Sequence, residues 1–198
     1  MPVSNIDTLT SQIEVGRDFE FIFFWDYLDN HGGNLVPGCL DQWWPAPIEA
    51  DGQRFATAEH FMMWHKAMMF EDVGIAGQIL RSTNPAQAQQ LGRHVADFDE
   101  SVWASVRNDV VVAGNFAKFS QHRPLRDFLM STGESILVEA SSDDTLWGIG
   151  LAIDDPRRGD VWQWTGQNRL GFALMAVRDY LRRGETVTRA TVSPTTKP

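Results

Sequence analysis

The sequence predicts an α+β fold in which helices are in the majority and strands are few and short. Residues 58–70 contain neither Gly nor Pro and are dominated by Ala, Met, Phe and Trp, as in a mostly buried helix. The segments that suit strands are apolar runs of only a few residues. Helices and strands do not alternate regularly, which argues against a doubly wound nucleotide-binding sheet. At 198 residues the chain has the size of one compact domain with one core.

A strand and a hairpin are the first predicted elements. Residues 21–25 form a bulky apolar run that suits a buried strand, and the turn-rich residues 29–38 follow it. Residues 43–47 contain two prolines and cannot be helix interior, because each proline disfavours helical backbone in the residue before it. Residues 48–55 have Asp51-Gly52 at their middle, which predicts a tight hairpin.

Capping residues mark where the helices begin. Ser, Thr, Asp and Asn are favoured at the N-cap because their side chains accept a hydrogen bond from the first turn. The predicted helices are 58–70 after Thr57, 72–80, one that starts at Pro85 after Asn84 and ends at Gly92, one from Asp99 to about Phe119, and a short one from Pro124. The helix from Asp99 carries an apolar stripe at helical spacing, so we expect one face of it to be buried.

Two short strands, over residues 136–140 and 145–149, and a closing helix from Asn168 to Arg183 complete the predicted fold. The inward face of the closing helix consists of Leu170, Leu174, Val177 and Leu181. Thr and Pro are abundant near the end of the sequence. We therefore divide the chain into an N-terminal extension over 1–18, a domain over 19–183 and a disordered tail over 184–198.

Composition limits the classes of function. The formal charge of −9 argues against general binding to a nucleic-acid backbone, although a local Arg and Lys cluster could still hold a small phosphate compound. The single cysteine, Cys39, excludes an internal disulfide and a Cys-based zinc cluster and fits a reducing compartment. Residues 1–20 carry four acidic side chains and no unbroken apolar run, as neither a signal peptide nor a membrane helix would. We expect a cytoplasmic protein without membrane contact.

A carboxylate and an amine share one face of the predicted helix 58–70. Glu59, Met63 and Lys66 are spaced i, i+4, i+7, so the two charges lie about two turns apart. Burial among Met side chains would raise the pKa of the carboxyl group and lower that of the amine, which suits acid–base chemistry near neutral pH. The alternative is a solvated charge pair at a helix edge. His60 and His65 suit structural roles better than metal ligation, because no H-E-x-x-H spacing accompanies them.

A second cluster combines carboxylates, an aromatic ring and glycines over residues 143–150. Glycines let a backbone approach a ligand closely, and the indole of Trp147 can stack on a base or pack against ribose. The alternative is an ordinary turn into a strand with a core tryptophan. Asn168 caps the closing helix or offers its amide to a base or ribose hydroxyl. The cations that could hold phosphate bidentately, or simply lie at the surface, are Arg93, Arg107, Lys118 and Arg169.

Several short blocks occur in one order along the chain. They are Phe55, Thr57-Ala58-Glu59-His60 and Lys66; Gly92-Arg93; Trp103 and Arg107; Lys118-Phe119; Thr132-Gly133; Leu137-Val138-Glu139-Ala140; Asp144 and Trp147-Gly148-Ile149-Gly150; and Gly166, Asn168 and Leu170-Gly171. Together they resemble the NADAR family, also called YbiA-like, from about Phe21 to Arg178.

The resemblance implies a mainly helical α+β domain that acts as an N-glycosidase on ribosyl compounds. Known substrate classes are phosphoribosylaminopyrimidine intermediates of riboflavin synthesis and ADP-ribosylated guanine bases. The family's active-site pattern falls on Glu59, Lys66, Trp103, Asp144 and Trp147. Residues 40–45, Leu-Asp-Gln-Trp-Trp-Pro, depart from the Leu-Ser-Asn-Phe-Tyr-Pro type of many relatives, so base or ribose preference can differ.

The expected site has no metal and no cofactor. Its catalytic residues are Glu59, Lys66 and Asp144, and its substrate-binding residues are His60, Arg93, Trp103, Arg107, Trp147, Gly148 and Asn168. We expect the Glu59–Lys66 face and the Asp144–Trp147 turn to line one cleft for a sugar phosphate, with ADP-ribose or a ribose phosphate as ligand. ADP-ribosylated guanine within nucleic acid is a candidate substrate. The alternatives are a non-catalytic ADP-ribose or NAD reader and a structural interaction protein; the sequence leaves the oligomeric state open.

Overall fold

The computed structural model describes residues 3–25 and 35–187, which form two compact units. We call the unit made of Met1–Asp41 and Pro124–Glu185 the parallel-sheet unit. Gln42–Arg123, with the chain end from Thr186, makes up the helical unit. Each unit is described separately.

The parallel-sheet unit is built on two strands that are far apart in the sequence. Strand β1 (Phe21–Phe24) pairs in parallel with β4 (Ile136–Glu139), with Phe21 opposite Ile136 and Phe24 opposite Glu139. All four residues of β4 are buried. This burial on both sides suits the continuous apolar sequence of a parallel strand.

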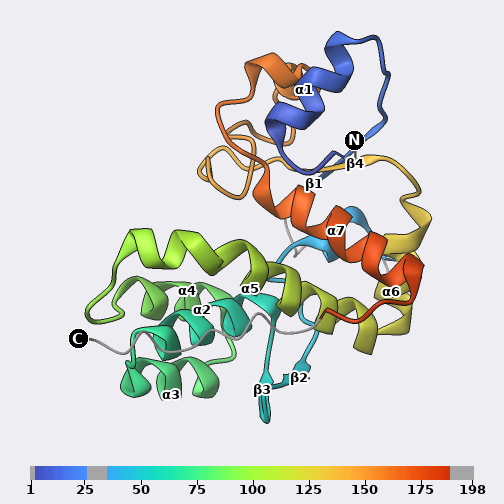
Figure 1. Cartoon of the computed structure of the whole chain (residues 1–198). Coiled ribbons are helices and arrows are strands. Elements are labelled where there is room, and N and C mark those ends of the chain that lie inside the picture. The colour runs from blue at the N-terminus through green and yellow to red at the C-terminus, as the bar shows by residue number, and fades with distance from the viewer. Residues whose placement is uncertain (1–2, 26–34, 188–198) are drawn as a thin grey trace. The chain divides into compact units, whose positions relative to one another are not determined.

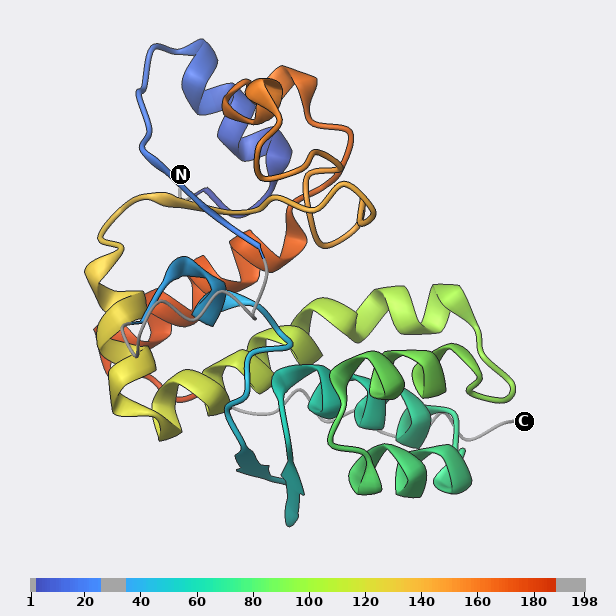
Figure 2. The same ribbon diagram turned by 180° about the vertical axis from the view of Figure 1, so that it is seen from behind.

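Helix α7 (Arg169–Arg183) covers β4 at close range (Figure 1). A Cβ atom at Gly171 would lie 1.9 Å from the carbonyl oxygen of Leu137, so only glycine permits this approach. The predicted inward residues Leu170, Leu174, Val177 and Leu181 are all buried. The unit also contains α1 (Ile6–Glu14), α6 (Arg123–Ser131) and the 3-10 turns η1 (Pro37–Leu40), η2 (Pro156–Gly159) and η3 (Val161–Gln163). Figures 1 and 2 both show α1 beside the orange segment that follows β4.

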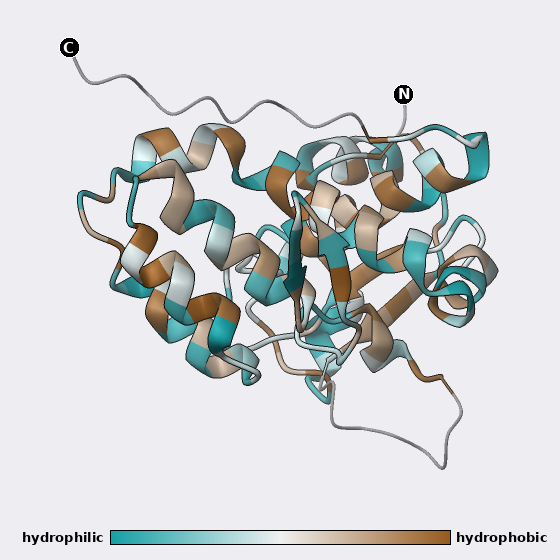
Figure 3. Cartoon of the chain, turned by 90° about the horizontal axis from the view of Figure 1, so that it is seen from below, coloured by the Kyte–Doolittle hydropathy of each residue, from teal (hydrophilic) through white to brown (hydrophobic). Residues whose placement is uncertain are grey.

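The helical unit is arranged around α2 (Ala58–Met69). Helices α3 (Val73–Arg81), α4 (Pro85–Arg93) and α5 (Glu100–Gln121) all pack against it. Two glycines allow close packing on α2, because a Cβ atom would lie 2.1 Å from Met63 Sδ at Gly92 and 2.7 Å from Phe61 Cδ1 at Gly114. Figure 3 shows that the helices of the chain carry both hydrophobic and hydrophilic segments along their length.

The hairpin of β2 (Ile48–Ala50) and β3 (Gln53–Phe55) completes the helical unit. Asp51 and Gly52 form its turn with φ angles of 54° and 71°, as a tight hairpin turn requires. The end of α5 holds the edge strand, because the Gln121 side chain accepts from Glu49 N at 2.9 Å and donates to Glu49 O at 2.8 Å.

The predicted mainly helical α+β class is confirmed, and most predicted elements are present with shifts of one or two residues. The strand predicted over 145–149 is wrong, because these residues form bends whose carbonyl groups accept hydrogen bonds from residues 165–170 instead of from a strand. Helix α1 was not predicted, although Asn5 and Thr8 form a capping box at its start. The predicted turn 29–38 lies largely outside the described residues, as does most of the predicted tail, and the predicted domain boundaries stay predictions.

Candidate functional site

Glu59 is held in the first turn of α2 by two local features. Thr57 caps the helix by accepting from His60 N at 3.4 Å, and the Glu59 N–H donates to the Gln42 carbonyl at 3.1 Å. The Glu59 side chain is buried, at 4% exposure, where the positive end of the helix dipole favours an anion. The carboxylate is therefore largely removed from water, and the main chain that carries it is fixed by the Thr57 cap and by the Gln42 carbonyl.

Gln42 belongs to the segment 40–45, and no motif or spacing in the sequence predicted a role for it. Its side-chain oxygen accepts from the buried Asn115 of α5 at 2.8 Å, and its amide nitrogen lies 3.3 Å from Met62 Sδ. Gln42 thus links α5 to the start of α2 while its main-chain carbonyl holds Glu59. Because the Gln42 carbonyl bonds to the Glu59 N–H, Gln42 acts on the site by positioning.

Lys66 lies half-buried near the end of α2, on the face predicted for it. Burial lowers the pKa of its ammonium group most, and Arg93 lowers it further, while the carboxylates of Glu100 and Glu59 act in the opposite direction. The close contact of α4 at Gly92 explains how the following residue, Arg93, comes to act on Lys66. A lysine with a lowered pKa is better suited to proton transfer or to nucleophilic attack than an exposed one.

Helix α5 adds Glu100, Trp103 and Arg107 to this unit. Trp103 and Arg107 are buried, and Arg107 Nη1 donates to Glu100 Oε1 at 2.5 Å. Glu100 was not predicted, although it lies seven residues before Arg107, the same spacing as between Glu59 and Lys66. Its carboxylate acts on Lys66 while it bonds to Arg107, so it connects two predicted site residues.

The other candidate residues of the helical unit lie in different environments. His60 is buried with Nδ1 2.9 Å from Thr57 Oγ1, and burial lowers the pKa of its ring. Arg93 is exposed and donates to Gln89 Oε1 at 3.1 Å. Lys118 is fully buried with its ammonium 5.0 Å from the Phe119 ring centre, so it is not placed at the surface as a phosphate ligand.

In the parallel-sheet unit, Asp144 organises the turn that carries Trp147. Its Oδ1 accepts from Leu146 N at 2.8 Å and from Trp147 N at 2.7 Å. Asp144 and Trp147 are both half-buried. Such an Asx turn fixes the backbone of residues 144–147 and leaves part of the indole accessible.

Gly148 lies where two loops approach closely. A Cβ atom there would lie 2.9 Å from the Glu139 carbonyl and 3.0 Å from that of Asp144. The Gly148 carbonyl accepts from Asn168 N at 3.0 Å. The glycine at this position therefore serves close packing between main-chain segments.

Asn168 is fully buried, at 0% exposure, beneath this turn. Its Nδ2 donates to the Leu137 carbonyl at 2.9 Å, and its Oδ1 accepts from Glu139 N at 3.0 Å. It occupies the N-cap position of α7 without a side-chain capping bond. Its amide is thus engaged with β4, and its predicted contact with substrate is untested.

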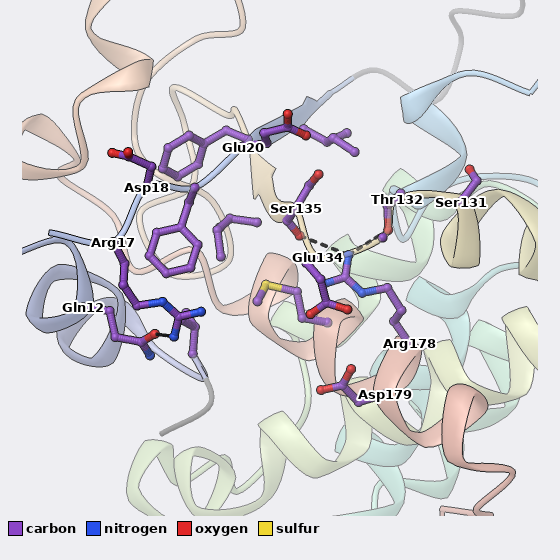
Figure 4. Close-up of a pocket in the computed structure, with 17 residues that line it drawn as sticks. Gln12, Arg17, Asp18, Glu20, Ser131, Thr132, Glu134, Ser135, Arg178 and Asp179 are labelled. Atoms are coloured by element: carbon purple, nitrogen blue, oxygen red, sulfur yellow. Dashed lines mark hydrogen bonds between the residues drawn. The ribbon is translucent and has the colours of Figure 1, made fainter.

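A cavity of about 920 Å³ lies in the parallel-sheet unit and contains none of the predicted site residues. Its walls come from residues 17–22, the turn 131–136 and α7 (Figure 4). Arg178, 2% exposed, donates from Nη1 to Thr132 Oγ1 at 2.7 Å and to the Ser135 carbonyl at 3.0 Å. These bonds tie α7 to the turn before β4, which is a structural role.

Two further observations concern ligands and membranes. Among the described residues, no three His, Cys, Asp or Glu side chains are grouped to hold a metal ion. Over residues 3–25 and 35–187, no helix combines the length and apolar character needed to cross a membrane.

The family model of the NADAR domain matches residues 23–182, a range with parts of both units. The chain belongs to the NADAR domain family. An N-glycosidase of Acanthamoeba polyphaga mimivirus is 34% identical over 165 residues, covering 81% of this chain and 95% of that protein. A riboflavin biosynthesis protein of Vibrio vulnificus is 32% identical over 161 residues, but this match spans only 38% of that protein.

The NADAR domain also resembles the N-glycosidase YbiA of Escherichia coli, with 33% identity over 135 residues, or 68% of this chain and 76% of YbiA. The NMR structure of YbiA superposes with a TM-score of 0.67 at 29% identity, covering 85% of this chain and 88% of YbiA. Two of these relatives are thus named as hydrolases of N-glycosidic bonds. Segment 3–22, with α1, lies before the family match.

Proposed function

We propose that this NADAR domain is an N-glycosidase that hydrolyses the bond between a nitrogen base and a ribose or phosphoribose. The observation that carries the proposal is the environment of α2, where buried Glu59 and half-buried Lys66 lie within mutual electrostatic influence. Burial lowers the pKa of Lys66, which favours its use as a proton donor or nucleophile beside a carboxylate. The names of the mimivirus and E. coli relatives support the same chemistry.

The reaction requires stabilisation of positive charge at the anomeric carbon. The C–N bond breaks with its electron pair going to the base nitrogen, and water forms the new C–O bond. We assign the proton of the attacking water to a carboxylate, Glu59 or Asp144, from which it returns to the departing base. We propose Trp103 as an apolar wall for a base or ribose in the helical unit, and Trp147 as a ring on which a base can stack in the parallel-sheet unit.

Lys66 is assigned one of two roles. As a cation it binds a phosphate or a neighbouring carboxylate. As a neutral amine it attacks C1 of the opened ribose and forms an imine with loss of water. Borohydride added during turnover separates them, because only the imine is reduced to a stable adduct on Lys66, detectable by mass spectrometry.

Two substrate classes follow from the resemblance and the relatives. One is ADP-ribosylated guanine, free or within nucleic acid, and the other is a phosphoribosylaminopyrimidine, as the name of the Vibrio relative suggests. Incubation with each compound, followed by chromatography of the released base, decides between them. We expect release from one of the two by the wild type, and release slowed by about 10² to 10⁴-fold in Glu59→Gln.

A reader domain is the alternative outcome of this assay. It predicts that calorimetry detects ADP-ribose binding while neither compound is cleaved at any enzyme concentration. That result would overturn the glycosidase proposal but would keep ADP-ribose as the ligand.

A further inference from the structure

Phe98 presents a half-exposed aromatic ring over Lys66. The ring is 40% exposed, and the Lys66 Nζ lies 3.9 Å from its centre. A cation within about 6 Å of an aromatic face is attracted by the negative charge of the π system. Phe98 was not a predicted site residue, because neither its spacing nor its neighbours in sequence indicate this contact.

The loop that carries Phe98 is fixed on both sides. Before it, Ala96 N donates to Asp72 Oδ2 at 3.0 Å, which ties the loop to the start of α3. After it, Asp99 caps α5 by accepting from Ser101 N at 2.7 Å and Val102 N at 3.2 Å. The main chain on both sides of Phe98 is therefore fixed by hydrogen bonds at two helix termini.

Asp97 and Phe70 further define the orientation of the ring. Asp97 has a φ of 51°, a left-handed conformation that residues other than Gly adopt infrequently. This conformation turns the chain directly before Phe98. Phe70, at the end of α2, contacts the Phe98 ring with centres 5.3 Å apart and planes at 64°.

Burial and nearby charges shift the pKa of Lys66 in opposite directions, so an aromatic ring beside the amine can change the balance between its charged and neutral forms. In the part of the chain that the structure describes, the charges acting on it come from α2 itself (Glu59), from α4 (Arg93) and from α5 (Glu100). Burial and Arg93 favour the neutral amine, whereas the two carboxylates favour the ammonium ion. The aromatic face of Phe98 acts in the same direction as the two carboxylates, because it attracts only the ammonium form of Lys66.

We propose that Phe98 is a positioning residue for Lys66, whose ring confines the ammonium group and favours its charged form over the neutral amine. The inference deepens the proposed function and rests on it for its catalytic meaning. Whether Lys66 binds an anion or attacks a sugar carbon, the fraction of charged lysine sets the pH range in which it can act. Phe98 would then act on the reaction through Lys66 and not by contact with the reacting atoms.

The test is to measure the titration of Lys66 directly. The chain contains three lysines, Lys66, Lys118 and Lys197, so NMR of 13C-lysine-labelled protein gives few signals, and Lys66→Arg identifies the one that belongs to Lys66. In Phe98→Leu an apolar side chain still covers the amine, but the π face is lost. We expect the pKa of Lys66 to fall by about half a pH unit. Phe98→Tyr, which keeps an aromatic face, should restore it.

Val73→Ala is the control, because Val73 is an exposed apolar residue of the same unit that is placed at the start of α3. It should leave the titration of Lys66 unchanged. An equal pKa in wild type and Phe98→Leu, or the same fall in Phe98→Leu and Phe98→Tyr, would overturn the proposal. Folding of each variant is checked by its thermal unfolding midpoint.

Turnover gives the second measurement. If the domain is a glycosidase, the limb of its pH–rate profile that Lys66→Arg abolishes should move to lower pH in Phe98→Leu by the same amount as the titration. If no substrate is cleaved by the wild type, the proposed function fails, while the NMR titration still decides the inference about Phe98.

Discussion

In the helical unit the predicted catalytic side chains lie on one helix among interacting charges, whereas in the parallel-sheet unit they lie in a turn whose polar groups bond to the main chain. Glu59 is buried and Lys66 has a lowered pKa, so the surroundings of α2 alter the chemistry of these groups. Asp144 instead accepts two backbone N–H groups at 2.8 and 2.7 Å. The carboxylate and the amine of α2 are thus modified by burial and by nearby charges, whereas the Asp144 carboxylate serves the main chain of its own turn.

Glu59→Gln should have the largest effect and tests whether α2 carries the chemistry. The amide has nearly the shape of the carboxylate but cannot accept the proton of water. We expect kcat to fall by about 10² to 10⁴-fold, with ADP-ribose binding retained by calorimetry. Near-normal turnover would remove Glu59 from the reaction and shift the assignment to Asp144.

Asn168→Ala tests the structural character of the parallel-sheet unit. The change leaves the buried Glu139 N–H and Leu137 carbonyl without their side-chain partners. We expect a loss of about 2–4 kcal/mol in the free energy of unfolding, measured with urea. Gln167→Ala, at the exposed neighbouring position, is the matched control and should change stability by less than about 0.5 kcal/mol. Normal stability together with lost binding would instead make Asn168 a substrate ligand.

Trp147→Ala tests whether the Asp144 turn provides a wall. If the half-buried indole stacks on the base, its loss should raise KM by about tenfold to a hundredfold with kcat changed less. Trp162→Ala, which removes a 59% exposed indole from the same unit, should leave KM unchanged. A fall in kcat at constant KM would mean that Trp147 acts in the transition state, and the contrast between the units would weaken.

Asp72→Asn should have the smallest effect and concerns the loop that carries Phe98. In the folded chain, the hydrogen bond from the Ala96 N–H lowers the pKa of the Asp72 carboxyl group most, and the bond from the Ile75 N–H lowers it further. Its stabilising contribution is therefore present above the unfolded-state pKa of about 3.9 and is lost as the pH falls through the lower folded-state value. Urea unfolding should show the variant less stable by about 0.5 kcal/mol at pH 7 and by less at pH 3. A difference that grows toward acid pH would contradict this reading.

Local sequence predicted the elements of the helical unit better than those of the parallel-sheet unit. The caps Thr57, Asn84 and Asp99 and the Asp51-Gly52 turn act within a few residues, so their effects could be inferred from spacing. The segment 145–149 contains residues suited to a strand, but its hydrogen bonds go to residues 165–170. Pairing over such a distance in sequence leaves no periodic pattern.

The features of the candidate site also differ in whether they could be predicted from the sequence. The shared face of Glu59 and Lys66 follows from helical spacing and was predicted. The contact of Lys66 with Phe98, and the influence of the Arg93 and Glu100 charges on Lys66, depend on the packing of α4 and α5 against α2 and could not be predicted. The burial of Lys118 and Asn168 was also missed, because a cation or an amide in a sequence gives no indication of whether the fold encloses it.

The sequence by itself determined the mainly helical α+β class, the limits of most helices, the family and the pairing of Glu59 with Lys66 on one helix face. Backbone propensities, capping and side-chain periodicity act over a few residues, and the family pattern is a property of the sequence. Only the tertiary structure decided which charges surround Lys66, that an exposed phenyl ring covers it, and that Asn168 supports β4. Those features arise from contacts between distant segments, whose energies depend on burial and on close packing at glycines such as Gly92 and Gly171.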